Sequence, residues 1–249
     1  MIEISGLEKM FNRGQANEVH ALKNINLSVT AKEFVIIVGA NGSGKTSLLN
    51  CLSGSVFPSD GEIKISGNLV THLPEYKRSK WIARVFQNPL SGTASDLSIL
   101  DNFRLASLRT SSKPLHIGVN ERFKEKVREN IASLNMGLEN KIDQPMGTLS
   151  GGQRQALTLL MSVMDEAHIL LLDEPTAALD PRSAETVMKT ADQIISDYGL
   201  TAILITHNLK EAFQYGTRII QMAEGKITKN VNSEGKSALQ PTKMFEWFT

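Results

Sequence analysis

The segment that spans residues 34–54, FVIIVGANGSGKTSLLNCLSG, constrains the fold most strongly. Its apolar residues 34–38 predict a strand buried on both faces, and residues 47–49 predict the start of a helix. The loop between them has the pattern G-x-x-x-x-G-K-[ST], in which backbone N–H groups and a helix N-terminus surround a phosphate. We therefore expect a nucleotide site here; the alternative is a glycine-rich structural turn.

Residue types in this loop point to separate tasks. Lys45 is expected to reach the β- and γ-phosphates, and the Thr46 hydroxyl is expected to bind Mg²⁺. The residues of this segment expected to contact the nucleotide are Gly39, Asn41, Gly42, Ser43, Gly44, Lys45, Thr46 and Ser47.

Length, charge and cysteine content bound the other possibilities. At 249 residues and 41% hydrophobic, the chain is long enough for one large domain that carries a smaller lobe. A net charge of +1, from 27 basic and 26 acidic residues, argues against a nucleic-acid partner. A single cysteine, Cys51, excludes an intrachain disulfide and suits a reducing compartment. Because the N-terminus lacks a signal-peptide pattern and no apolar run approaches roughly 18–20 residues, we expect a soluble, cytoplasmic chain.

Apolar periodicity predicts an α/β fold. Residues 2–4 and 25–29 alternate as half-buried antiparallel strands do, and they would form a layer over the nucleotide side of the core. Residues 168–172 and 201–206 read as buried strands, and residues 219–228 read as a terminal hairpin.

Composition changes after residue 87, from β-branched runs to a Gly/Ser/Pro-rich loop and then to helical patterns. We expect a single domain, 1–249, in which 1–87 and 161–232 form a core with a β subdomain, 88–160 form a helical subdomain, and 233–249 form a C-terminal tail. Residues 109–120 read as a surface loop of the helical part. Apolar residues that suggest docking of the tail are Met244, Phe245, Trp247 and Phe248.

Polar side chains follow several predicted strands. In a parallel sheet, ligands gather at the carboxyl ends of the strands, and Asp173 and Glu174 follow one such strand. Asp173 would hold Mg²⁺ through water, and Glu174 would accept a proton from a water molecule that attacks the γ-phosphate. An acidic strand end or a helix cap is the alternative. Gln87 lies at the end of the strand predicted for residues 81–86. His207 follows the strand predicted for residues 201–206 in the same way, although a histidine in such a position is more often structural.

Two further features, at Ser150 and at Phe11, are ambiguous by themselves. Ser150 is a good N-cap, and Gly151 and Gly152 would leave the next N–H groups uncovered, which makes either a second anion site or a flexible helix entry. Phe11 is either a packing residue or a platform for a base. Asp180 is expected to cap the helix that starts at Pro181.

The order of these segments resembles that of the ATP-binding-cassette (ABC) ATPases over about residues 1–230. The resemblance implies a P-loop NTPase core with a mainly parallel sheet, an antiparallel β subdomain and an inserted helical subdomain. The matching motifs are the Walker A loop (39–46), the Q-loop (Gln87), the LSGGQ signature (149–153), the Walker B strand (169–173), the catalytic glutamate (Glu174), the D-loop (178–180) and the switch histidine (His207).

Cofactors and site residues follow from this resemblance. It implies ATP and Mg²⁺, an ATP-hydrolysing activity, and a Phe11 that stacks on adenine, where the family more often has tyrosine. The implied catalytic residues are Glu174, His207, Lys45 and Gln87. The implied metal-site residues are Thr46, Gln87 and Asp173, and further nucleotide contacts are Ser150, Gly151, Gly152, Gln153 and Asp180.

Partners also follow from the family. Two copies would dock head to tail, so that the Walker A loop of one faces the LSGGQ helix of the other across a shared ATP. The resemblance implies a separate membrane permease, a place on the inner face of the cell membrane and a substrate-binding protein. Residues 84–89 and 92–94 further resemble bacterial importer subunits for aromatic amino acids (tryptophan/tyrosine type), although Pro175 departs from that group. We expect import of a small solute such as an amino acid; the alternative is a mechanotransmission or lipoprotein-release ATPase.

Overall fold

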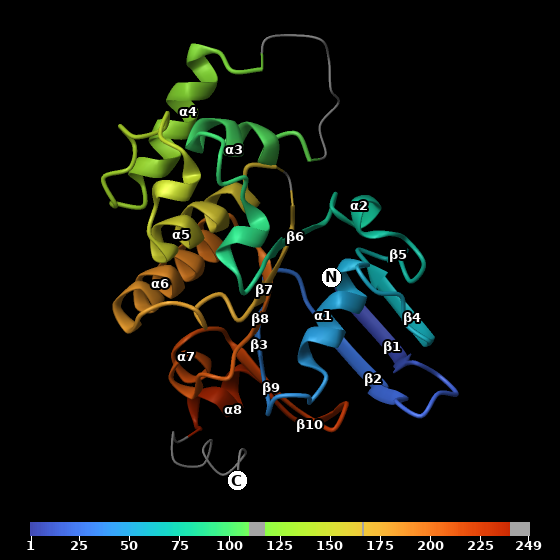
Figure 1. The fold of residues 1–249 in the computed structure, drawn as a ribbon. Helices are drawn as coiled ribbons and strands as arrows, with labels where there is room; N and C mark the ends of the chain where they lie inside the picture. Colours follow the sequence, from blue (N-terminus) through green and yellow to red (C-terminus); the bar gives the residue numbers. More distant parts are fainter. Residues whose placement is uncertain (110–117, 166, 240–249) are drawn as a thin grey trace.

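The computed structural model describes residues 1–109, 118–165 and 167–239, and it contains two sheets with helices around them (Figure 1). The strands of the larger sheet are β3 (Phe34–Val38), β6 (Ile82–Val85), β7 (Ile169–Asp173), β8 (Thr201–Ile205), β9 (Arg218–Ala223) and β10 (Lys226–Val231). They lie in the order β10-β9-β3-β8-β7-β6. Neighbouring strands are parallel except for the β9–β10 hairpin, so the carboxyl ends of β3, β6, β7 and β8 meet at one edge.

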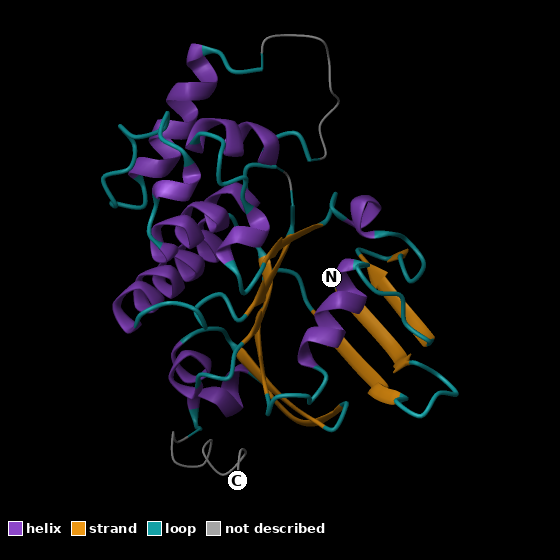
Figure 2. Ribbon diagram, viewed as in Figure 1, coloured by secondary structure: helices purple, strands orange, loops and turns teal. Residues whose placement is uncertain are grey.

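A second, antiparallel sheet packs on one side of this core. Its strands are β1 (Ile2–Phe11), β2 (Val19–Val29), β4 (Asp60–Ile65) and β5 (Asn68–Leu69), in the order β2-β1-β4-β5. Helix α1 (Lys45–Ser53) lies between the two sheets (Figure 2). The mainly parallel core and the antiparallel layer confirm the predicted α/β fold class.

Successive residues of β3 point into two different hydrophobic cores. Phe34, Ile36 and Val38 pack with the helices on one face of the larger sheet. Val35 and Ile37 pack with α1 and the antiparallel sheet on the other face. Each of these residues is at most 5% exposed. Strand β3 is therefore buried on both faces, as its continuous apolar run predicted.

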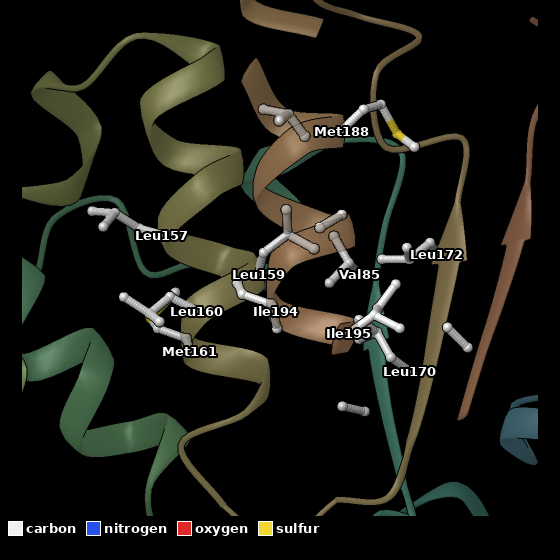
Figure 3. Packing of buried hydrophobic residues seen from close by; sticks show 14 of the residues in the cluster. Val85, Leu157, Leu159, Leu160, Met161, Leu170, Leu172, Met188, Ile194 and Ile195 are labelled. Atoms are coloured by element: carbon white, nitrogen blue, oxygen red, sulfur yellow. The ribbon is translucent and has the colours of Figure 1, made fainter. Parts of the chain in front are cut away.

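Several helices cover the face of the larger sheet opposite α1 (Figure 1). They are α5 (Gly151–Ser162), α6 (Pro181–Asp197) and α7 (Leu209–Gln214). Helices α3 (Ile99–Ala106) and α4 (Glu121–Ala132) pack against α5 and against each other, farther from the sheet. In Figure 3, Leu159 of α5 faces Ile194 of α6 and Val85 of β6, and Leu170 of β7 lies beside Ile195 of α6. Leu157, Leu160 and Met161 lie on the side of α5 away from the sheet. Each such side chain contributes roughly 1.5–3 kcal/mol when fully buried, so this packing stabilises the position of α5 in the fold.

Arg78 fixes the far end of α1. It ends the short helix α2 (Glu75–Arg78), is fully buried, and donates through Nη1 to the carbonyls of Cys51 and Leu52 at 2.7 and 2.9 Å. Burial lowers its pKa to about 10, so it stays charged at neutral pH. Because the last carbonyls of a helix lack intrahelical partners, this cation caps α1 and favours its dipole.

Two predicted segments differ in extent. The strand expected over residues 81–86 covers only Ile82–Val85, because its ladder with β7 ends where Val85 pairs with Leu172. The tail contains a short helix, α8 (Ser233–Ser237), whose Gly235 N–H donates to the side chain of Asn232.

The remaining elements are short, and part of the chain is not described. The described residues also contain two short 3-10 helices, η1 (Pro89–Gly92) and η2 (Met146–Thr148). Residues 110–117 of the expected surface loop, and the four apolar residues of the expected tail contact, lie outside the described residues. In the described part of the chain, no helix combines the length and hydropathy that crossing a membrane requires.

Candidate functional site

The loop between β3 and α1 exposes backbone donors at the start of a helix. Gly44 occupies the N-cap position, and no side chain caps α1 there. The first N–H groups of a helix have no intrahelical partner, and with the helix dipole they favour an anion. Two glycines are required by close packing: a Cβ on Gly39 would lie 2.2 Å from Met222 O, and one on Gly44 would lie 2.5 Å from Ala21 O.

Lys45 lies within the loop rather than in solvent. Its side chain donates from Nζ to the carbonyls of Gly39 and Ala40 at 2.8 and 3.0 Å, and the residue is 5% exposed. Burial lowers the pKa of its ammonium group, and the carboxylates of Glu174 and Asp173 oppose that shift. The loop therefore holds a buried cation beside two acids.

Thr46 and Asp173 bring two oxygen atoms together at the carboxyl end of the sheet. Thr46 Oγ1 lies 3.4 Å from Asp173 Oδ1. The other carboxylate oxygen, Oδ2, accepts a hydrogen bond from Arg84 Nη2 at 2.8 Å. Two of the three residues predicted for the metal site therefore lie together in the fold. Hydroxyl and carboxylate oxygens are ligands that Mg²⁺ prefers.

Glu174 and His207 also meet at this edge. His207 Nδ1 lies 3.2 Å from Glu174 Oε2, and the Glu174 side chain is 16% exposed. Glu174 has a positive φ of 46°, which is uncommon outside glycine and concentrates at functional sites. Its backbone N–H donates to Ile205 O, which ties the start of this loop to β8.

Glu211 of α7 joins the loops that carry Glu174 and His207. Its buried carboxylate accepts hydrogen bonds from Thr176 Oγ1 at 2.8 Å and from Thr206 Oγ1 at 2.6 Å. Thr176 follows Glu174 by two residues and Thr206 precedes His207, so one side chain fixes the spacing of both loops.

A cavity of about 740 Å³ opens beside the loop. Residues 41–47 line one side, and Phe11, Gln87 and Glu174 also line it. Lys9 Nζ lies 4.8 Å from the centre of the Phe11 ring, so that ring has a cation near it. Apart from Gly39, the sequence-predicted residues of the loop therefore share one cavity with Gln87 and Phe11.

The predicted LSGGQ residues lie elsewhere. Ser150 Oγ accepts from Gln153 N, and Gln153 Oε1 accepts from Ser150 N, both at 3.2 Å, which forms a capping box at α5. Gly151 is exposed, but Gly152 is buried, and a Cβ on it would lie 2.7 Å from Ser183 Cβ of α6. None of residues 150–153 is among the described residues that line the 740 Å³ cavity.

Asp180 lies apart from that cavity as well. Its Oδ1 accepts from the N–H groups of Arg182 and Ser183 at 3.1 Å each, as the N-cap of α6. Its role as a helix cap agrees with the sequence pattern.

Sequence reasoning missed Arg84 and Glu211. The sequence pattern predicts Arg84 within a strand and within the 84–89 segment that resembles importer subunits, without a role at the site, although a charged residue within an apolar strand is itself a signal for a buried partner. Glu211 carries no comparable signal, because an acid in the first turn of a helix is ordinary.

The residues fit ATP and Mg²⁺. The cavity size is within the usual range for small-molecule sites, about 300–1,000 Å³. Among the described residues, the buried Ser43 Oγ has no hydrogen-bond partner, and it lies in the loop where a phosphate oxygen would supply one. When bound, Mg²⁺ supplies positive charge that offsets the charge of the phosphates. A carboxylate at Glu174 can accept a proton from water beside them.

Comparisons with known proteins agree with this geometry. The family model described as ABC transporter matches residues 22–177. A tyrosine transport ATP-binding protein of Clostridioides difficile (strain R20291) is 36% identical over 249 residues, covering 100% of this chain and 98% of the relative. A lipoprotein-releasing system ATP-binding protein, LolD 1, of Caulobacter vibrioides is 30% identical and covers 94% and 97% of the two chains.

A solved structure gives the same result for the fold. The dimeric, post-hydrolysis form of the ATP-binding cassette MJ0796 with ADP and Pi superposes with a TM-score of 0.80 at 26% identity, covering 94% of this chain and 99% of that one. The chain therefore belongs to the ABC transporter family, as an ATPase subunit that uses ATP and Mg²⁺.

Proposed function

We propose that this ATPase powers import of a small solute, such as an amino acid, through a separate membrane permease. The observation that carries the proposal is the full-length similarity to a protein named for tyrosine transport, at 36% identity. A substrate-binding protein outside the membrane would deliver the solute. The ATPase would work at the inner face of the cell membrane, held there by the permease.

Lipoprotein release is the second candidate, because a relative named for it matches at 30% identity over nearly its whole length. Isolation of the native membrane complex through a tag on this chain distinguishes the two. A co-purifying permease and binding protein, with ATP-dependent uptake of labelled tyrosine by the reconstituted complex, support import. A membrane protein with a large periplasmic domain and no binding protein would contradict import.

We assign a separate role to each part of the chain from its position in the fold. Residues 1–87 and 161–232 would bind the nucleotide, 88–160 would contact the permease, and 233–249 would form a peripheral tail. Gln87 would report the state of the site to the permease, since it lies both at the cavity and at the start of the helical part.

Catalytic roles are proposed on the same basis. Lys45 would contact the β- and γ-phosphates, and Thr46, Gln87 and Asp173 would serve Mg²⁺. Glu174 would take the proton of the attacking water, and His207 would hold the Glu174 carboxylate and the γ-phosphate in place. Phe11 would stack on adenine.

We also propose that two copies share each ATP head to tail. Residues 150–153 are not among the described residues that line the cavity of the same chain, so a contact between them and the bound nucleotide would need a second copy. The N-terminus of α5 from a second copy, with Ser150, could place donors there. The similar cassette MJ0796 has been solved as a dimer.

A Ser150→Arg substitution tests this assembly. The long side chain would fill the place of the second copy's phosphate, so we expect loss of ATP-dependent dimers while the monomer keeps its ATP affinity. The readout is sedimentation of the variant in a Glu174→Gln background, with and without ATP. Loss of the helix cap costs about 1 kcal/mol, so the melting temperature is recorded as well. The matched control is Ser133→Arg, at an exposed serine after α4; undiminished dimers of Ser150→Arg would contradict the shared site.

A further inference from the structure

Arg84 forms a buried ion pair beside the proposed metal site. Its Nη2 lies 2.8 Å from Asp173 Oδ2, and the two side chains are only 9% and 10% exposed. Arg84 lies on β6, whose ladder runs parallel to β7, the strand that ends in Asp173. Because a buried charge pair is costly unless its geometry is good, such a pair needs a physical reason.

The two oxygen atoms of the Asp173 carboxylate have different neighbours. Oδ2 accepts the hydrogen bond from Arg84, whereas Oδ1 lies 3.4 Å from Thr46 Oγ1. A planar guanidinium on one oxygen restricts rotation of the carboxylate. The other oxygen is therefore aimed at the Thr46 hydroxyl, on the side of the phosphate loop.

Further contacts hold the guanidinium itself. Arg84 Nη1 lies 3.3 Å from Ser53 Oγ, at the end of α1, and 3.5 Å from Ser55 Oγ. Its Cζ lies 4.8 Å from the centre of the Phe86 ring, next to Gln87. Arg84 thus touches the end of the phosphate-loop helix, the end of β7 and the segment that enters the Q-loop.

We propose that Arg84 is a positioning residue for Mg²⁺, which acts by orienting Asp173 Oδ1 toward Thr46. The proposal rests on the proposed role of Asp173 as a metal-site residue. Groups that hydrogen-bond a ligating carboxylate orient it, and their loss typically weakens metal binding about 10–100-fold. The guanidinium sits on the oxygen away from Thr46, so it supports the metal side of the carboxylate and does not occupy it.

The test compares ATP binding with and without Mg²⁺. A fluorescent ATP analogue is titrated in EDTA and then at increasing MgCl₂, using Arg84→Met, which keeps an unbranched stem but removes the guanidinium group and its charge. We expect the affinity in EDTA to stay unchanged and the half-saturating Mg²⁺ concentration to rise about 10–100-fold. An unchanged Mg²⁺ requirement would reduce Arg84 to a structural residue. A lower requirement would mean that Arg84 competes with the metal, and either outcome would overturn the proposal.

Further variants keep the test decisive. Arg84→Lys retains the charge without the planar guanidinium, so we expect a smaller rise in the half-saturating Mg²⁺ concentration. If Arg84→Met does not fold, an unchanged half-saturating Mg²⁺ concentration in Arg84→Lys would also contradict the proposal. Arg128→Met, at a partly exposed arginine of α4, is the control. In an Asp173→Asn background, Arg84→Met should produce no additional rise. If Asp173→Asn itself leaves the Mg²⁺ requirement unchanged, the proposed role of Asp173 fails, independently of Arg84.

Discussion

A Glu174→Gln chain is expected to bind ATP and to hydrolyse it about 10²–10⁴-fold more slowly than the unaltered chain, the range that general-base catalysis contributes. The carboxamide has nearly the same shape as the carboxylate, but it cannot accept the proton of the attacking water. Glu174 lines the nucleotide cavity, and its Oε2 lies 3.2 Å from His207 Nδ1, so the loop geometry should survive the change. Phosphate release under single-turnover conditions measures the effect.

A matched control separates this effect from a general loss of charge. Glu125→Gln removes an exposed glutamate of α4 whose side chain is 62% exposed, and it should leave hydrolysis unchanged. Normal turnover by Glu174→Gln would show that another group takes the proton. Slow turnover accompanied by lost ATP affinity would instead indicate a collapsed site.

Lys45→Ala is expected to weaken ATP binding about 10–100-fold, because hydrogen bonds to charged groups contribute roughly 1.5–3 kcal/mol. Lys45 Nζ now donates to Gly39 O and Ala40 O inside the loop. It can turn from these carbonyls to phosphate oxygens, which are stronger acceptors because they carry charge. Isothermal titration calorimetry with ATP and Mg²⁺ measures the loss of ATP affinity.

The control for this substitution is a lysine far from the cavity. Lys189→Ala, on α6, removes a side chain that is 64% exposed and should leave the affinity unchanged. Thermal unfolding of both variants establishes that they fold. Equal ATP affinity in Lys45→Ala and the unaltered chain would contradict the assignment of this loop as the phosphate site.

The fold could be predicted from the sequence where local pattern and burial coincide. The apolar run of β3, the glycines of the following loop and the start of α1 are adjacent in the chain, so their spacing alone implies their geometry. The placement of Asp173 near Thr46 also followed, because the carboxyl ends of parallel strands meet at one edge.

Contacts between distant segments could not be predicted in this way. Arg84 and Asp173 are separated by 89 positions, and Glu211 bonds Thr176 across 35 positions. Their pairing depends on strand order and on side-chain rotamers, which no local pattern encodes. The same limit applies to Gly152: its role in a helix entry was expected, but its close approach to Ser183 follows from how α5 packs on α6.

The central claim, that one chain holds half of an ATP site and a second copy completes it, is tested most directly by mixing two defective chains. In a Glu174→Gln background, Lys45→Ala lacks the phosphate lysine and Ser150→Arg lacks the completing helix end, so neither should dimerise alone. In a mixed dimer, the phosphate loop of the Ser150→Arg chain would face the unaltered N-terminus of α5 in the Lys45→Ala chain, which makes one intact site. Co-purification of differently tagged copies should therefore appear only in the mixture and only with ATP. No association in the mixture, or ATP-dependent dimers of either variant alone, would contradict the account.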